Sequence, residues 1–239
     1  MKHTPLEIII PAYNEGENIL KLMKLFNLNV KTRFKVLICY DLENDNLFNY
    51  QDQFKDFNFE IELIENPSKG PLTAIKQGFL KGNSDAVIVY PADDFLNYNL
   101  LDSMFKKYTE GNEIVVASRF MEGGSMKNCP FFKSLIVRSA SFTLYMLSSI
   151  PVRDASNGFR LFSRKLLREV NIESKVGFAY SLELLVKCHR LKYNIAEVPA
   201  LWEERSEGES KFKIFKWLPQ YLKWYIYGLQ TTWLGKSKI

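Results

Sequence analysis

The sequence has 239 residues, of which 46% are apolar and 25% charged, values that fit a globular protein and exclude a disordered or collagen-like chain. Lys and Arg number 32 against 27 Asp and Glu, and the net charge of +5 favours an anionic small molecule or membrane surface over nucleic acid. The three cysteines form no close pair and two histidines are too few for a histidine-rich zinc site, so we expect a reducing, cytoplasmic location.

Short apolar runs alternate with helical segments through the first half of the chain. The runs that predict buried strands are Leu6–Ile10, Phe34–Tyr40, Phe59–Ile64, Ala86–Tyr90 and Ile114–Ala117. The segments with helical spacing are Glu15–Asn27, Asn46–Phe54, Leu72–Lys81 and Leu100–Tyr108. This alternation predicts an α/β fold with a mostly parallel, Rossmann-like sheet and helices on both faces. Ligands of such sheets bind at the carboxyl ends of the strands.

The pattern changes after about residue 120. A glycine-rich loop precedes a long helix, and the remaining segments are shorter and more polar. The expected elements are helices over about 132–149, 164–169 and 180–191 and a strand over 195–198. With no repeat and no convincing linker, we expect one continuous domain over residues 1–210 and an extension over 211–239.

The extension interleaves aromatic residues with lysines and contains three of the four tryptophans. Such a composition is typical of a helix that lies in a membrane interface, on anionic lipid. The alternative is that these aromatic residues pack on the domain formed by residues 1–210 or on a second copy of the chain. No apolar stretch reaches the length of a spanning helix. The sequence also shows no signal peptide, so we expect a peripheral protein on the inner face of the membrane.

Polar clusters follow the first two predicted strands. Pro11, Ala12, Tyr13 and Glu15 form a turn that can place backbone and carboxylate groups against a ligand, with Asn14 as a helix cap in the alternative interpretation. The second strand ends at Asp41, which can accept hydrogen bonds from a ribose or a base. Nearby, Asp45 has helix capping as its simplest interpretation.

The next three strands also end in charged residues. Lys69 can hold an anion at a helix N-terminus, although neither a P-loop nor a G-x-G-x-x-G motif is present. Ala92, Asp93 and Asp94 follow the most apolar strand. The two adjacent carboxylates favour a site for Mg²⁺ or Mn²⁺ that bridges to substrate phosphates. The alternative is that Asp93 or Asp94 only caps the next helix. Arg119 suits a pyrophosphate, with an exposed surface arginine as the alternative.

Seven motifs in order carry a resemblance to a known family. They are P-A-Y-N-E, an Asp after the second strand, G-x-x-x-A-x-x-x-G, A-D-D, S-R-F-x-E-G-G, R-D-A-S-N-G-F-R and R-S-E-G-E-S-K. The chain resembles the family-2 glycosyltransferases, in particular their dolichyl-phosphate mannose synthase-like branch, over about residues 6–212. The resemblance implies a GT-A fold, a nucleotide-diphospho-sugar donor, a divalent cation and inversion at the anomeric carbon. It also implies a nucleotide-sugar half over about 1–120 and an acceptor half over 121–210.

The resemblance also assigns single residues to the donor. It puts Pro11, Ala12, Tyr13 and Glu15 around the nucleotide and Asp41 at the base or ribose. We expect Lys69 and Ala92 to contact the donor as well. Asp93 matches the second acid of the D-x-D metal motif, with Asp94 as a second ligand, and Arg119 matches the diphosphate-binding arginine.

Further residues are implied at the reaction centre and the acceptor. Asp154 is implied near the reaction centre. Arg205, Ser210 and Lys211 match a late loop over donor and acceptor phosphate, and Lys133 and Arg138 match basic residues beside the acceptor helix. The implied catalytic set is Asp93, Arg119, Asp154 and Arg205.

Two departures from the family pattern bear on the cation and on the acceptor. Pro91 replaces the first acid of D-x-D, and Phe95 stands where a polar ligand is usual. The T/E-D base and the Q-x-x-R-W motif of polysaccharide-making relatives are absent, and a phosphate acceptor explains this because it is already anionic. The leading interpretation is therefore transfer of a sugar to a polyprenyl phosphate of the dolichyl or undecaprenyl type.

Two alternatives stay open. One is transfer to a sugar hydroxyl in a cell-surface polysaccharide or lipopolysaccharide, with Asp154 or Glu183 as the base. The other is an inactive protein that binds a nucleotide sugar or a lipid. A homo-oligomer formed through the C-terminal helix is a further expectation.

Overall fold

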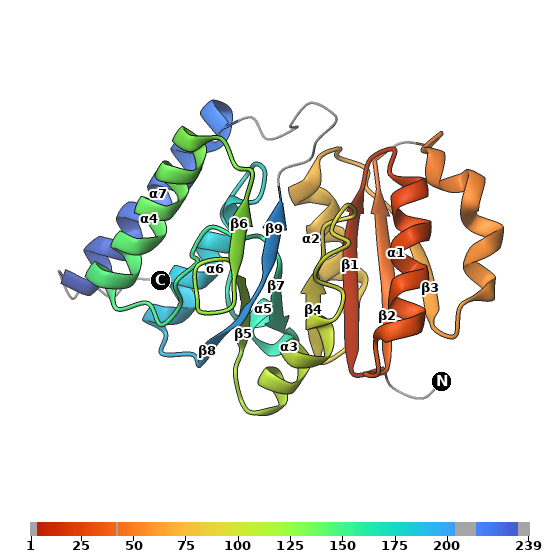
Figure 1. Cartoon of the computed structure of the whole chain (residues 1–239), viewed down its shortest axis with the longest axis horizontal. Coiled ribbons are helices and arrows are strands. Elements are labelled where there is room, and N and C mark those ends of the chain that lie inside the picture. The colour runs from red at the N-terminus through yellow and green to blue at the C-terminus, as the bar shows by residue number, and fades with distance from the viewer. Residues whose placement is uncertain (1–3, 42, 204–213, 234–239) are drawn as a thin grey trace.

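The computed structural model describes residues 4–41, 43–203 and 214–233 (Figure 1). Its main sheet has seven strands in the order β3-β2-β1-β4-β7-β5-β8, and β6 pairs with β9 in a second, small sheet. The strands are β1 (Leu6–Ala12), β2 (Phe34–Tyr40), β3 (Glu60–Glu65), β4 (Ala86–Val89), β5 (Ile114–Ser118), β6 (Ser125–Lys127), β7 (Arg160–Ser163), β8 (Ile195–Pro199) and β9 (Leu201–Glu203). The helices are α1 (Gly16–Asn29), η1 (Asn46–Asp56), α2 (Pro71–Lys81), α3 (Leu100–Thr109), α4 (Phe131–Ser148), α5 (Arg164–Glu169), α6 (Ala179–Arg190) and α7 (Ile214–Trp233), of which η1 is a 3₁₀ helix.

The strand β7 is the main departure from the expected fold. It lies between β4 and β5 and is antiparallel to both, whereas the other pairs of the main sheet are parallel. Because β7 runs in the opposite direction, the residues that precede it lie at the edge where β4 and β5 end. The loop before β7, which contains Asp154, is thereby brought to the carboxyl edge of the parallel strands.

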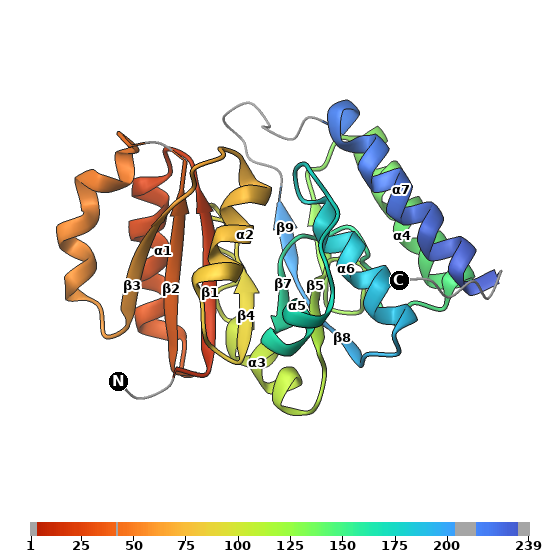
Figure 2. The same cartoon turned by 180° about the vertical axis from the view of Figure 1, so that it is seen from behind.

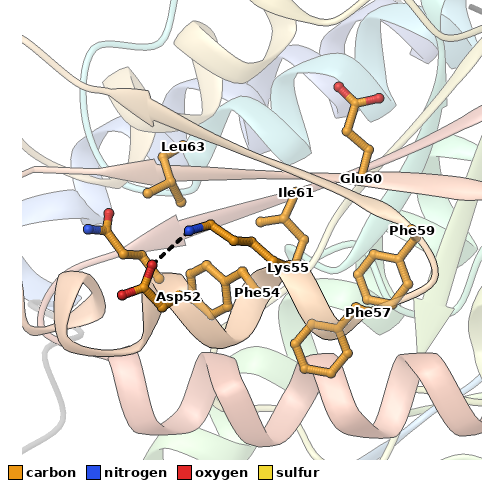
Figure 3. Close-up of a pocket in the computed structure, with 9 residues that line it drawn as sticks. Asp52, Phe54, Lys55, Phe57, Phe59, Glu60, Ile61 and Leu63 are labelled. Atoms are coloured by element: carbon orange, nitrogen blue, oxygen red, sulfur yellow. Dashed lines mark hydrogen bonds and ion pairs between the residues drawn. The ribbon is translucent and has the colours of Figure 1, made fainter.

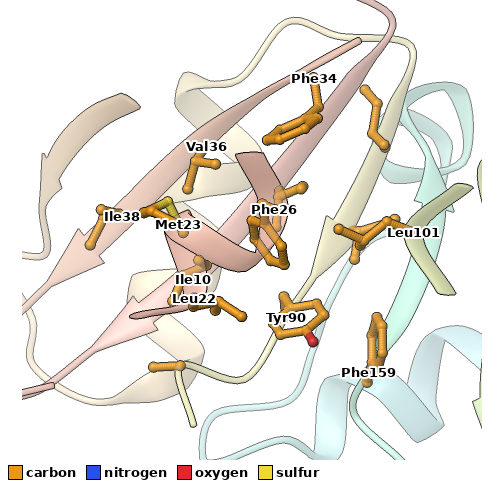
Figure 4. Packing of buried hydrophobic residues seen from close by; sticks show 14 of the residues in the cluster. Ile10, Leu22, Met23, Phe26, Phe34, Val36, Ile38, Tyr90, Leu101 and Phe159 are labelled. Carbon is orange, nitrogen blue, oxygen red and sulfur yellow. The ribbon is translucent and has the colours of Figure 1, made fainter. Parts of the chain in front are cut away.

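The central strands are buried on both faces, which explains why they are apolar throughout. Ile8 and Ile10 pack in the cluster that contains α1 and α3, and the intervening Ile9 packs in the cluster that contains α2. In the first cluster, the rings of Phe26 and Tyr90 meet edge to face with centroids 5.1 Å apart (Figure 4). The expectation of a sheet with helices on both faces is confirmed.

The helices α4 and α7 lie side by side at the end of the molecule remote from β3 (Figures 1 and 2). Their contact includes a hydrogen bond of 2.8 Å between the Thr143 and Tyr225 hydroxyls. On the inner side of α7, Trp224 is 1% exposed, and its Nε1 donates to Ser174 Oγ at 2.9 Å. For Trp224 the interfacial prediction is wrong, because its ring packs on the catalytic domain. Within the described residues, no helix has the length and apolar character needed to cross a membrane.

Candidate active site

The predicted site residues gather at one edge because the strands that lead into them are parallel. Pro11 and Ala12 end β1, and Asp41, Asp93 and Arg119 follow β2, β4 and β5. The register pairs Ala12 with Tyr40 and Ile9 with Val89, so β1 holds the loops after β2 and β4 on either side of its own end. Ala12 is buried, whereas Tyr13 is 47% exposed at the rim of this edge.

Two loops of the nucleotide half are tied together by polar side chains. Asp45 accepts from the backbone N–H groups of Asn14 (2.8 Å) and Leu47 (3.0 Å), so it caps η1, as its simplest interpretation predicted. Asn14 does not cap the helix that follows it, because its Oδ1 accepts from Asn46 N–H at 3.3 Å. The capping alternative for Asn14 is wrong, and this residue instead joins the turn after β1 to the start of η1.

The Asp41 carboxylate organises the loop between β3 and α2. Its Oδ1 accepts from Asn66 Nδ2 at 2.5 Å and its Oδ2 accepts from Gly70 N–H at 2.6 Å. Lys69 has a left-handed backbone (φ 39°), and Gly70 has φ 102°, a conformation that suits glycine. A carboxylate has about four lone-pair sites, so Asp41 keeps acceptor capacity for a ribose hydroxyl while it holds the Lys69 loop in place.

Asp94, the second of the two adjacent aspartates after β4, is held within its own loop. Asp94 accepts from Leu96 N–H (2.9 Å), Asn97 N–H (3.1 Å) and Asn97 Nδ2 (2.7 Å), so both of its oxygens are used within its own loop. Burial raises the pKa of Asp94, these hydrogen bonds partly offset the effect, and the like charge of Asp93 raises it further. The helix-cap alternative is wrong for Asp94, because α3 begins at Leu100 with Asn99 at its N-cap. Asp94 instead fixes the loop that follows β4, and Asp93 remains the residue that matches the D-x-D acid.

Arg119 and Asp154 form a buried ion pair at the same edge. Arg119 Nε donates to Asp154 Oδ2 at 2.7 Å and Nη2 donates to Oδ1 at 3.0 Å, a bidentate geometry that fixes the plane of the guanidinium. Ser156 completes the arrangement, because its Oγ accepts from Arg119 Nη2 at 2.6 Å and donates to Asp154 Oδ1 at 2.9 Å. The alternative of an exposed surface arginine is wrong, since the Arg119 side chain is 9% exposed.

Neither of the two candidate bases is available to a substrate. Burial alone would raise the pKa of Asp154. The charge and hydrogen bonds of Arg119, together with a hydrogen bond from Ser156, instead hold this pKa below its usual value. Glu183 is fully buried and accepts from Glu173 N–H (2.6 Å), Ser174 N–H (2.8 Å) and Lys187 Nζ (2.8 Å). Asp154 therefore positions Arg119, and Glu183 holds the loop before α6.

A second layer of basic and aromatic side chains lies beside Arg119. The Arg119 guanidinium lies 5.1 Å from the centre of the Phe120 ring. The Arg138 guanidinium, on α4, lies 4.9 Å from the centre of the same ring. Lys133 Nζ lies 5.0 Å from the centre of the Trp202 ring. The sequence interpretation did not include Phe120, Ser156 or Trp202, although the first two stand inside the motifs S-R-F and R-D-A-S-N-G-F-R.

Some predicted residues lie beyond what the structure describes. Arg205, Ser210 and Lys211 are outside the described residues. Among the described residues, no group of three or more His, Cys, Asp or Glu side chains could hold a metal. A cation here would have to be held by Asp93 together with substrate phosphates and water, which is an ordinary arrangement for Mg²⁺.

One groove of the molecule lies away from this edge. It has a volume of about 510 Å³ and is lined by residues of η1 and of the edge strand β3, with Phe54, Phe57 and Phe59 on its walls (Figure 3). It contains none of the predicted site residues. The site is therefore assigned from the strand ends and their hydrogen bonds.

Comparison with known proteins places the chain in a family. The profile of Glycosyl transferase family 2 matches residues 7–170. The dolichol-phosphate mannosyltransferase of Pyrococcus furiosus is 26% identical over 229 residues, which cover 92% of this chain and 64% of that relative. The dolichyl-phosphate beta-glucosyltransferase of Drosophila melanogaster is 26% identical over 237 residues, covering 89% of this chain and 71% of the relative.

A solved structure shares the fold at lower identity. Glucosyl-3-phosphoglycerate synthase from Mycobacterium tuberculosis, solved with Mn²⁺, UDP-glucose and phosphoglyceric acid, superposes with a TM-score of 0.67 at 15% identity, over 95% of this chain and 80% of that one. The expected GT-A fold is thereby confirmed. With the family profile spanning most of the catalytic domain, the chain belongs to glycosyl transferase family 2.

Proposed function

We propose that the chain transfers a sugar, with inversion, from a nucleotide-diphospho-sugar to a polyprenyl phosphate. The names of the archaeal and insect relatives support a lipid-phosphate acceptor. The archaeal relative is longer, and this chain spans 64% of it, so the substrate assignment rests on the site as well as on the names.

The observation that carries the proposal is the state of the two candidate bases. Transfer to a sugar hydroxyl needs a group that removes a proton, and its pKa is best placed near the working pH. The pKa of Asp154 is instead lowered by Arg119, and Glu183 is fully buried in hydrogen bonds. A phosphate acceptor needs no such base because it carries its own negative charge near pH 7. The site thus favours the lipid-phosphate acceptor over a glycan hydroxyl.

Each side chain at the edge then has a role. Pro11, Ala12 and Tyr13 contact the nucleotide, and Asp41 accepts from its ribose. Arg119, held by Asp154, presents a fixed guanidinium to phosphate, where oriented charge stabilises the transition state without reorganisation. Arg138 and Lys133 add positive charge on the side of α4 and attract the acceptor phosphate.

A divalent cation fits the donor side of this site. Mg²⁺ or Mn²⁺ on Asp93 would neutralise charge on the diphosphate leaving group, as the Mn²⁺ in the solved glucosyl-3-phosphoglycerate synthase suggests for the fold. The enzyme would work at a membrane surface, because its acceptor is a lipid. The bidentate Arg119–Asp154 pair argues against an inactive binding protein, and a turnover assay with a panel of nucleotide sugars decides between the two.

The acceptor's own titration gives a pH prediction. The second pKa of a phosphate monoester is about 6, so kcat/KM for a polyprenyl phosphate should fall as the pH is lowered through that value. Titration of Asp154 does not change kcat/KM in this pH range, because its folded-state pKa lies below the usual carboxyl value. The measurement is the pH profile of kcat/KM in detergent micelles. A single acid limb at pH 7 or above would instead indicate a protein base.

The direct test of the proposal is product analysis. The chain is incubated with labelled UDP-, GDP-, TDP- or CDP-sugars, Mn²⁺ and a polyprenyl phosphate, and the lipid is then extracted into an organic phase. Label in the lipid phase with one donor supports the proposal, whereas label that appears only in an added glycan overturns it.

A further inference from the structure

The helix α4 has its apolar side turned away from the protein. The residues that it buries are Ser141, Leu144 and Ser148, so two of the three are hydroxyl-bearing. Its exposed large side chains include Phe132 at 77% and Phe142 at 63%. The other exposed apolar residues of this helix are Phe131, Leu135, Ile136, Tyr145, Met146 and Leu147. A helix that packs on a water-facing protein shows the opposite pattern.

Five of the exposed apolar residues share one side of the helix, with Ser139 among them. At 3.6 residues per turn, Phe132, Ile136, Leu135, Phe142 and Met146 fall on one side, along the whole length of the helix. Exposed apolar surface of this kind marks an interaction site. We call these five side chains the α4 stripe.

The charge around the stripe is of one sign. Residues 123–153 contain no Asp or Glu, and their basic residues are Lys127, Lys133, Arg138 and Arg153. An apolar helix face flanked by basic side chains is typical of a helix that lies in the plane of an anionic membrane. A second copy of this chain is a poorer occupant, because two such faces would bring like charges together.

Two basic residues of α4, Arg138 and Lys133, lie on the side of the helix nearer the proposed active site. Arg138 lies over the Phe120 ring at 4.9 Å, and that ring also contacts Arg119. Lys133, in the first turn of α4, lies against Trp202. One helix thus carries both an outward apolar stripe and basic groups directed to the site.

We propose that the α4 stripe docks the enzyme on an anionic bilayer, an inference that rests on the proposed lipid-phosphate acceptor. The stripe enters the acyl boundary while Arg138 and Lys133 stay at headgroup level, where a polyprenyl phosphate holds its phosphate. This assigns docking to α4, whereas the sequence pattern favoured the C-terminal extension. Over residues 218–230, the part of α7 whose side chains the structure describes, the exposed large apolar residues are Leu218, Leu222 and Ile226.

The test is co-sedimentation of the full chain with phosphatidylcholine vesicles that contain about 30% phosphatidylglycerol, an anionic lipid. The variant replaces Phe132, Ile136 and Phe142 with Gln, which keeps helix propensity. A matched control replaces Leu28 (79% exposed) and Leu80 (75% exposed), on α1 and α2, with Gln. Circular dichroism melting checks that both variants fold like the parent chain.

The α4 variant should lose vesicle binding by about tenfold or more, since three large side chains no longer leave water, and the control should bind like the parent. Added salt should weaken binding of the parent chain. Unchanged vesicle binding of the α4 variant overturns the inference. The inference also fails if the parent chain does not bind vesicles but forms a dimer that the α4 variant no longer forms. Failure of the proposed function is a separate result, namely vesicle binding without sugar transfer to polyprenyl phosphate in micelles.

Discussion

Replacing Asp93 with Asn is expected to lower kcat by about 10²-fold or more, because a cation at the leaving group supplies several kcal/mol of charge stabilisation. Asp93 is the residue that matches the acid of the D-x-D motif, and both oxygens of Asp94 already accept hydrogen bonds from Leu96 and Asn97. The measurement is turnover as a function of Mn²⁺ concentration, with unfolding followed in parallel.

Asp94→Asn is the matched control. The amide oxygen can still accept from the backbone of Leu96 and Asn97, so the loop should keep its shape with a modest loss of stability. Turnover of this variant should keep its Mn²⁺ dependence. If Asp94→Asn instead loses cation dependence while Asp93→Asn retains it, the assignment of the two carboxylates is reversed.

Asp154→Asn should destabilise the fold by about 3–5 kcal/mol, the usual effect of removing one partner from a buried ion pair. The cause is the Arg119 guanidinium, which stays 9% exposed without its counter-charge. For a chain of this size that corresponds to a melting temperature lower by roughly 6–20 °C. Asp52→Asn, at an exposed pair with Lys55, should leave the melting temperature unchanged.

The difference in stability between the parent chain and Asp154→Asn depends on pH because the pKa of Asp154 is lowered. A depressed folded-state pKa gives stability that is present above the unfolded value and is lost as the pH falls through the folded value. The gap between the parent and Asp154→Asn should thus be constant from pH 5 to 8, roughly, and shrink in stronger acid. A gap that closes between pH 5 and 8 would contradict the buried pair.

A double variant separates positioning from folding. Asp154→Asn with Arg119→Gln removes both charges, so much of the lost stability should return while turnover stays low. Recovery of turnover in the double variant would show that the Arg119 charge is dispensable, and the proposed role of the pair would then fail.

The parallel part of the fold could be predicted because its strands are buried on both faces. Ile8, Ile9 and Ile10 all need apolar surroundings, and such runs are visible without a structure. The strand β7 was missed, because Arg160 and Ser163 break its apolar pattern. Both polar side chains are buried there, and the Arg160 guanidinium donates to the Ala155 carbonyl at 2.7 Å, a tertiary contact that local periodicity cannot show.

The sequence predicts which strand ends carry the site residues, but not which side chains contact one another there. Parallel topology is enough to bring Asp41, Asp93 and Arg119 to one edge. Which carboxylate pairs with which cation depends on β7, whose reversed direction delivers Asp154 to Arg119. The inward turn of the Trp224 ring likewise depends on Ser174, 50 residues away in the sequence.

The measurement that tests the central claim most directly compares a polyprenyl phosphate with the same polyprenol lacking the phosphate, in identical micelles with one accepted donor. The account predicts a glycosyl-phosphate lipid from the first and no product from the second, because the acceptor phosphate is both the nucleophile and the group that the basic residues Arg138 and Lys133 attract. Equal transfer to the polyprenol would contradict it, since a hydroxyl acceptor requires a base that neither Asp154 nor Glu183 provides.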